Sequence, residues 1–111
     1  MTTITLGGKE FTVRYPLNSI RALERETGKS VFQIVDLTSF SIDLMICVIW
    51  AGVLHANRLL TVAAVSQWLE DEKDLPALFA KCYEVFGQSL RGHIPVTGDE
   101  PEKSTSEEEK N

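Results

Sequence analysis

Residues 41–56 read SIDLMICVIWAGVLHA and carry the strongest fold signal in the chain. Ser41 is a typical N-cap, and Asp43 in the first turn favours the positive end of the helix dipole. Apolar residues at helical spacing mark one face, namely Ile42, Met45, Ile46, Ile49, Trp50 and Val53. The opposite face is also apolar, with Leu44, Cys47, Val48 and Ala51. A helix that is hydrophobic all round is surrounded by its domain, so we expect a central buried helix.

The N-terminal residues predict two β-strands. Apolar and polar residues alternate in residues 4–6 and again in residues 11–15, and this period of two indicates strands with one buried face. The glycine pair at residues 7–8 lies between the two runs and predicts a β-hairpin. Because two strands alone are marginally stable in water, the hairpin must pack its apolar face on helices or join another sheet.

Two registers of this hairpin keep the apolar residues on one face. A two-residue Gly-Gly turn pairs Ile4 with Phe11, whereas a four-residue loop over residues 7–10 pairs Leu6 with Phe11 and Ile4 with Val13. We favour the four-residue loop, because it places apolar side chains opposite one another.

Four further helices are predicted around the central one. The first covers residues 17–27 and ends at Gly28, a typical C′ residue. The second begins at Ser30 with a capping-box pattern, and Thr61 and Asp74 cap the last two. The predicted fold class is therefore α+β and mostly α, with an N-terminal β-hairpin followed by about five helices packed around the central buried helix.

The charge is uneven along the 111 residues, whose net charge is −5. Residues 96–111 contain six acids and two bases, whereas residues 1–95 contain ten acids and nine bases. Gly92 and Pro95 are expected to end the last helix, and no large apolar residue follows Val96. We therefore expect a single globular domain over residues 1–95 and an acidic, disordered tail over residues 96–111.

The composition excludes several classes of protein. A nearly neutral domain has no positive field to collect phosphates, so we expect no nucleic-acid binding. The longest uncharged apolar run covers residues 44–54, far short of the ~20 residues that span a bilayer, and no signal-peptide pattern begins the chain. Cys47 and Cys82 lie in apolar helical patterns, which predicts buried free thiols. We expect a soluble cytoplasmic protein without a membrane partner.

No motif predicts catalysis or metal binding. His55 and His93 are far apart in sequence, and neither Cys-x-x-Cys nor His-x-x-x-His occurs. No Gly-x-Ser-x-Gly is present, and the glycine pair at residues 7–8 joins strands instead of opening a helix around a phosphate. We therefore expect no enzyme activity, no catalytic residues, no cofactor and no metal.

The order of motifs resembles that of one protein family. The motifs are, in order, Phe11-Thr12-Val13, Leu17-x-x-Ile20-x-x-Leu23-Glu24-x-x-Thr27-Gly28-Lys29-Ser30, Val48-Ile49-Trp50-Ala51-Gly52-Val53-Leu54, Leu60-Thr61, Trp68-Leu69 and Tyr83-Glu84-Val85-Phe86-Gly87. Together they resemble the small tail assembly chaperones of long-tailed phages, especially the type found in gene transfer agents and prophages. The resemblance covers roughly residues 4–90.

The resemblance implies a non-enzymatic assembly factor in the bacterial host cytoplasm. Such a chaperone coats the tape-measure protein, keeps it soluble and brings in tail tube protein, so we also expect a homo-oligomer. The acidic tail would help solubility or mark where a longer, frameshifted product diverges. Two alternatives are a structural virion component, such as a tail tube or connector subunit, and a small cytosolic bacterial adaptor or regulator.

Partner contacts are expected at Trp68 and along the hairpin strands, whose edges could extend another sheet. The candidate residues in these strands are Ile4, Leu6, Phe11 and Val13.

Overall fold

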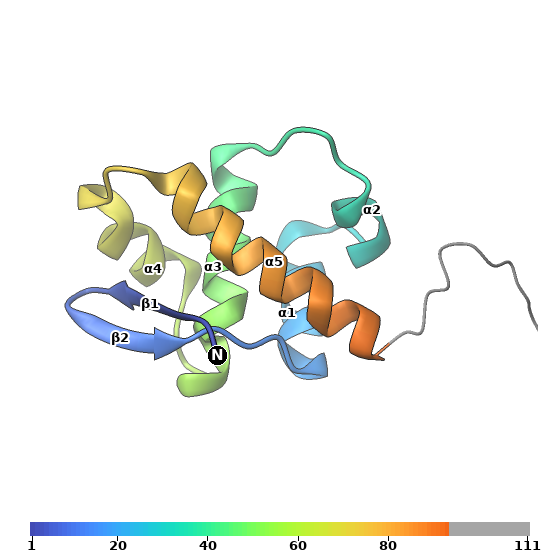
Figure 1. The fold of residues 1–111 in the computed structure, drawn as a ribbon, viewed down its shortest axis with the longest axis horizontal. Coiled ribbons are helices and arrows are strands. Elements are labelled where there is room, and N and C mark those ends of the chain that lie inside the picture. Colours follow the sequence, from blue (N-terminus) through green and yellow to red (C-terminus); the bar gives the residue numbers. More distant parts are fainter. Residues whose placement is uncertain (94–111) are drawn as a thin grey trace, which may run out of the picture.

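The computed structural model describes residues 1–93 and shows a two-stranded hairpin followed by five α-helices (Figure 1). The elements in chain order are β1 (Thr3–Leu6), β2 (Lys9–Thr12), α1 (Leu17–Thr27), α2 (Val31–Val35), α3 (Ile42–Val53), the 3-10 turn η1 (Leu54–Ala56), α4 (Val62–Trp68), the 3-10 turn η2 (Leu69–Asp71) and α5 (Leu75–His93). Helices α1, α4 and α5 all pack against α3. The predicted α+β fold class, mostly helical and built around a central helix, is confirmed.

The sequence of α3 explains its central place. The Ser41 hydroxyl accepts a hydrogen bond from the Leu44 N–H at 3.1 Å, so the predicted N-cap is confirmed. Every residue from position 47 to 53 is buried. Burial falls toward the first turn, where Met45 is half-buried and the Ile42 side chain is 59% exposed. Part of the predicted buried face therefore reaches the surface.

The hairpin register differs from the one that we favoured from the sequence. Ile4 pairs with Phe11 and Leu6 pairs with Lys9 across a two-residue turn at residues 7–8. The four-residue loop, which pairs Leu6 with Phe11, is therefore wrong. Both turn glycines have positive φ, 58° and 79°, as a tight type I′ turn requires. The turn geometry outweighs the gain from pairing apolar side chains.

The apolar face of the hairpin packs on helices, which was one of the two predicted arrangements. Ile4, Leu6 and Val13 are all buried in the common core. The chain beyond β2 then runs beside α3, where the Arg14 N–H donates to the Gly52 carbonyl at 2.9 Å. The hairpin is thus fixed to the central helix by both packing and hydrogen bonding.

Tyr15 joins this segment to α3. Its side chain is 2% exposed, and its hydroxyl donates to the Val48 carbonyl at 2.7 Å. Gly52 makes room for the ring, because a Cβ atom there would lie 2.7 Å from Tyr15 Oη. A side chain at position 52 and this tyrosine cannot both occupy their places.

The caps confirm the other predicted helix boundaries. Gly28 ends α1 with φ 70°, and Ser30 opens α2 with a complete capping box. The Thr61 hydroxyl and the Asp74 carboxylate each accept a backbone N–H three residues further on, both at 3.1 Å. Local sequence therefore sets where these helices begin and end.

Both cysteine thiols are free and buried, as the sequence predicted. Burial raises the pKa of Cys47 to about 11 and that of Cys82 to about 12. Both thiols therefore stay protonated at neutral pH and pack as small apolar groups.

Helix α5 reaches the last described residue, His93. The predicted domain boundary at residue 95 and the acidic segment 96–111 lie outside the described residues. Among the helices of residues 1–93, none combines the length and apolar character needed to cross a membrane.

Candidate functional site

Five aromatic rings in mutual contact connect the core with the surface. The buried Tyr15 ring lies 5.3 Å from Phe86, and Phe86 lies 5.9 Å from Tyr83, measured between ring centroids. Tyr83 lies 5.3 Å from Phe79 and 5.1 Å from Phe40, and the last two rings are 4.8 Å apart. Pairs at such distances contribute about 0.5–1.5 kcal/mol beyond their burial. The outer rings are therefore held in place by the rings beneath them.

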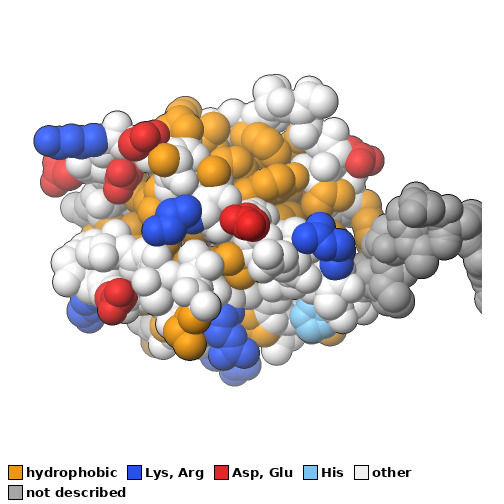
Figure 2. All heavy atoms as spheres, viewed as in Figure 1, with side chains coloured by type: hydrophobic (Ala, Val, Ile, Leu, Met, Phe, Trp, Pro, Cys, Tyr) orange, Lys and Arg blue, Asp and Glu red, His pale blue; other side chains and the backbone are white. Residues whose placement is uncertain are grey.

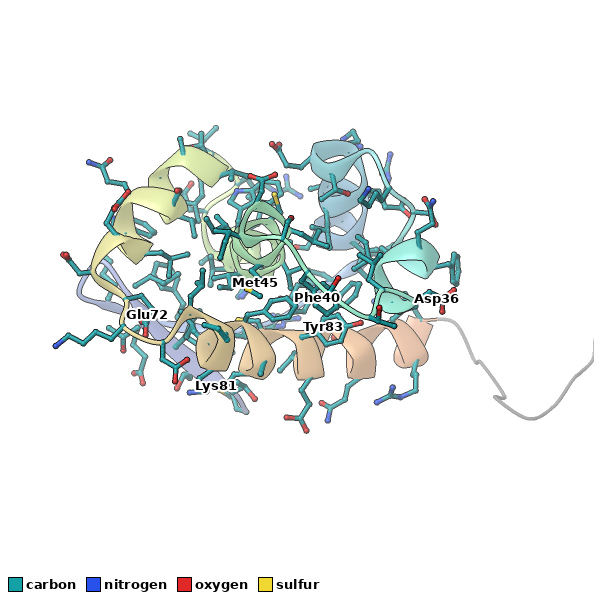
Figure 3. The ribbon with its side chains drawn as sticks, turned by 90° about the horizontal axis from the view of Figure 1, so that it is seen from above. Asp36, Phe40, Met45, Glu72, Lys81 and Tyr83 are labelled. Carbon is teal, nitrogen blue, oxygen red and sulfur yellow. The ribbon has the colours of Figure 1, made fainter. Side chains whose placement is uncertain are left out.

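The outer end of this chain of rings forms an apolar surface that we call the aromatic face, consisting of Phe40, Met45, Phe79 and Tyr83. Phe40 comes from the α2–α3 loop, Met45 from α3 and the other two from α5. Figure 3 shows Phe40, Met45 and Tyr83 close together between α3 and α5. All three are half-buried, whereas Phe79 is buried beneath them. Figure 2 shows hydrophobic side chains gathered on this side of the molecule, over α5 and the N-terminal end of α3.

Two exposed aliphatic side chains flank Phe40 along the chain. Leu37 precedes it in the α2–α3 loop, and Ile42 follows it in the first turn of α3. Both side chains are exposed. With the aromatic face, they extend the apolar surface on this side of the molecule.

The border of the aromatic face is mainly acidic. Burial raises the pKa of Tyr83, and the negative charge of Asp36 raises it further. Figure 3 shows Asp36 and Glu72 at opposite ends of the face, with Lys81 on the outer side of α5. Glu72 belongs to the connection 70–74, which contains four acids and one base. A partner with basic residues beside its apolar surface would match this border.

The side chains of the aromatic face carry no charge. Burial moves the pKa of the Tyr83 phenol further above neutral pH, so none of the four side chains brings a charge to the face. Within residues 1–93, no three His, Cys, Asp or Glu side chains come together to hold a metal ion.

The predicted contact residues lie elsewhere, at the hairpin and α4. The side chains of Ile4, Leu6 and Val13 are buried in the core and leave almost no surface for a partner. Phe11 and Trp68 are half-buried, and their ring centroids are 5.9 Å apart. Any contact that the strands make would therefore use their main chain and the outer parts of these two rings.

Trp68 packs closely on the hairpin turn. A Cβ atom at Gly7 would lie 2.6 Å from Trp68 Nε1, so the indole covers the turn where a side chain would otherwise stand. Much of the Trp68 ring therefore serves to hold the hairpin on α4.

Phe40 and Tyr83 were not among the predicted contact residues. Tyr83 follows Phe79 by four positions, so it lies on nearly the same side of α5 as the buried stripe. This spacing could have identified Tyr83 as a residue at the edge of the core. Phe40 lies in a loop without periodicity, and no local signal shows that it folds back on α5.

His55 has a structural contact. Its Nε2 atom lies 2.7 Å from the Thr12 carbonyl oxygen, at hydrogen-bonding distance, and so joins η1 to the end of β2. The contact uses the carbonyl oxygen of Thr12, the last residue of β2.

Comparison of the chain with protein-family models, with curated proteins and with solved structures found no match.

Proposed function

We propose that this protein is a non-enzymatic chaperone of phage or prophage tail assembly, which binds the tape-measure protein and helps to recruit tail tube subunits. The observation that carries the proposal is the aromatic face, where Phe40, Met45 and Tyr83 remain half-buried on a rigid ring cluster. The proposal includes self-association of the chaperone and a place of action in the host cytoplasm. Its family assignment rests on the order of sequence motifs.

A helical partner suits the geometry of this surface. The aromatic face lies between α3 and α5, and an amphipathic helix binds by laying its apolar stripe against such a surface. Aromatic side chains dominate binding energy at protein interfaces, because they bury a large area with few rotatable bonds. The acidic groups around the face keep the occupied chaperone charged, which opposes aggregation of a long apolar partner.

Co-expression with a helical fragment of the tape-measure protein from the same genome tests the proposal. The fragment should stay in the soluble fraction with the wild-type chain, and should precipitate when Phe40→Ser and Tyr83→Ser are combined. Phe32→Ser is the matched control, because Phe32 is 52% exposed on α2 and contacts none of the clustered rings.

Thermal unfolding of each variant separates lost binding from lost folding. The proposal is contradicted if the wild-type chain leaves the fragment insoluble, or if a folded double variant keeps it as soluble as the wild type does. Recovery of the chain as a stoichiometric part of purified particles would instead support a structural virion component.

A further inference from the structure

The described part of the chain separates its charges between two regions. Residues 36–43 and 70–84, the segments that contain Phe40, Phe79 and Tyr83, include seven acids and two bases. The rest of residues 1–93 contains three acids and seven bases. The nearly neutral domain is therefore acidic in these two ranges and basic in the remainder, although α1 itself carries two acids and two bases.

A groove lies between α1 and the C-terminal end of α3. It consists of two depressions of about 470 and 230 Å³ that share Asn18, Leu54 and Arg58 in their walls. Arg25 lines the larger depression, and one acid, Glu26, also lines it. Its apolar wall includes Trp50, whose indole N–H donates to the Leu60 carbonyl at 2.9 Å. We call this the α1–η1 groove.

A buried hydroxyl lines the smaller depression. The Ser19 side chain is 3% exposed and lines the depression together with Arg58. A serine hydroxyl can donate a hydrogen bond to an acceptor placed beside it. A carboxylate in the groove would accept a hydrogen bond from Ser19 and pair with the adjacent Arg58.

We propose that the acidic C-terminal segment of the same chain binds in the α1–η1 groove. Residues 96–111 carry six acids and two bases, so their net charge is negative. The two arginines that line the groove, Arg25 and Arg58, outnumber its one acid, Glu26. The stretch 94–111 can extend about 60 Å at ~3.3 Å per residue, which exceeds the diameter of a domain of this size. A tether of this kind gives a local concentration of ~1 mM, so even a weak contact is populated. This contact is independent of the proposed chaperone function.

The two tryptophans provide an internal comparison for a test. In ¹H–¹⁵N spectra of the full chain, the Trp50 indole signal reports on the groove and the Trp68 indole signal reports on the hairpin. Raising salt from about 0.1 M to about 1 M shortens the Debye length from ~10 Å to ~3 Å and releases the segment. We expect the Trp50 signal to move with salt and the Trp68 signal to stay.

Two sets of full-length variants should abolish the salt-dependent shift of Trp50. One combines Glu107→Gln, Glu108→Gln and Glu109→Gln, and the other combines Arg25→Gln with Arg58→Gln. The control combines Arg21→Gln with Lys29→Gln, which removes two exposed charges from outside the groove and should leave the shift intact. The variants remain interpretable because an unchanged Trp68 signal shows that the fold is kept.

The proposal is overturned if the Trp50 signal is the same in the wild type and the acidic-segment variant. It is also overturned if the shift depends on protein concentration, because the segment would then bind a second copy. A salt-dependent shift of Trp50 that persists in the Arg25→Gln and Arg58→Gln variant would place the contact outside the groove, and this would also overturn the proposal.

Discussion

Replacing Gly52 by alanine tests the contact between α3 and the segment after the hairpin. The new Cβ atom would lie 2.7 Å from Tyr15 Oη, 2.9 Å from Tyr15 Cζ and 3.1 Å from Val13 Cγ1. The first two distances are shorter than van der Waals contact allows, so the tyrosine must move. Its ring cannot move freely, because it is 2% exposed and packs against Phe86.

The expected loss of stability is about 2 kcal/mol. Forcing extra atoms into a packed core costs about 1–3 kcal/mol. Displacing Tyr15 also breaks its 2.7 Å hydrogen bond to the Val48 carbonyl, a contribution of about 1 kcal/mol. Alanine returns about 1 kcal/mol through its higher helix propensity at position 52. For a domain of this size, the loss corresponds to a Tm lower by about 8–16 °C.

Chemical denaturation followed by circular dichroism measures the change in the free energy of unfolding. Gly87→Ala in α5 is the control, because a Cβ there would have its nearest neighbour, Arg91 Nη1, at an ordinary 3.6 Å. That variant should be unchanged or more stable by up to about 1 kcal/mol. In a Tyr15→Phe background, Gly52→Ala should destabilise less, since the closest clashing atom is gone.

A Gly52→Ala variant as stable as the wild type would refute this reasoning. So would equal effects of Gly52→Ala and Gly87→Ala, because helix propensity alone would then explain both. In either case Tyr15 would not lie against α3 as described.

Three further predictions follow from local geometry. Gly7→Ala should destabilise the domain by about 2 kcal/mol and shift Trp68 fluorescence, because the residue has positive φ and its new Cβ atom would meet the indole. Gly8→Ala has φ 79° but open space around it, so it should destabilise by about 1 kcal/mol without the fluorescence shift. Thr61→Ala should destabilise by about 1 kcal/mol in denaturant unfolding, because the N-cap hydrogen bond of α4 is lost. Above pH 9, the free energy of unfolding should fall as pH rises toward 12. Burial holds the pKa of Cys82 near 12, whereas the unfolded thiol ionises near 9 and so stabilises the unfolded state. A free energy of unfolding that does not change with pH in this range would contradict the prediction.

Much of the helical framework could be predicted because its signals are local. Caps such as Ser41 and Thr61 are bonded to backbone groups three residues away, so the residues that decide a boundary stand beside it. The central place of α3 followed from apolar residues all around the helix, which leaves no face for water.

The hairpin register could not be decided from apolar alternation alone. Both candidate registers place Ile4 and Phe11 on one face, so burial does not distinguish between them. The preference of the Gly7-Gly8 pair for a tight turn with positive φ decides the register, and it outweighs the pairing of apolar side chains across the strands.

The aromatic face depends on contacts between distant parts of the chain. Phe40 and Tyr83 are brought to 5.1 Å only when the α2–α3 loop folds back on α5. The hairpin strands were predicted as contacts because free strand edges can pair with a partner, but the Ile4 and Leu6 side chains are buried in the core of the domain. A single sequence cannot distinguish an apolar residue covered by its own chain from one left for a partner.

Mapping the bound surface by NMR tests the central claim most directly. A helical tape-measure fragment would be added to the isotope-labelled full chain, and signals that lose intensity by cross-saturation would mark the contact. If the aromatic face is the binding surface, the signals of Phe40, Met45 and Tyr83 should lose intensity. The signals of Trp68 and Phe32 should be unaffected. Losses confined to the hairpin and Trp68, or no binding of the fragment at all, would contradict it.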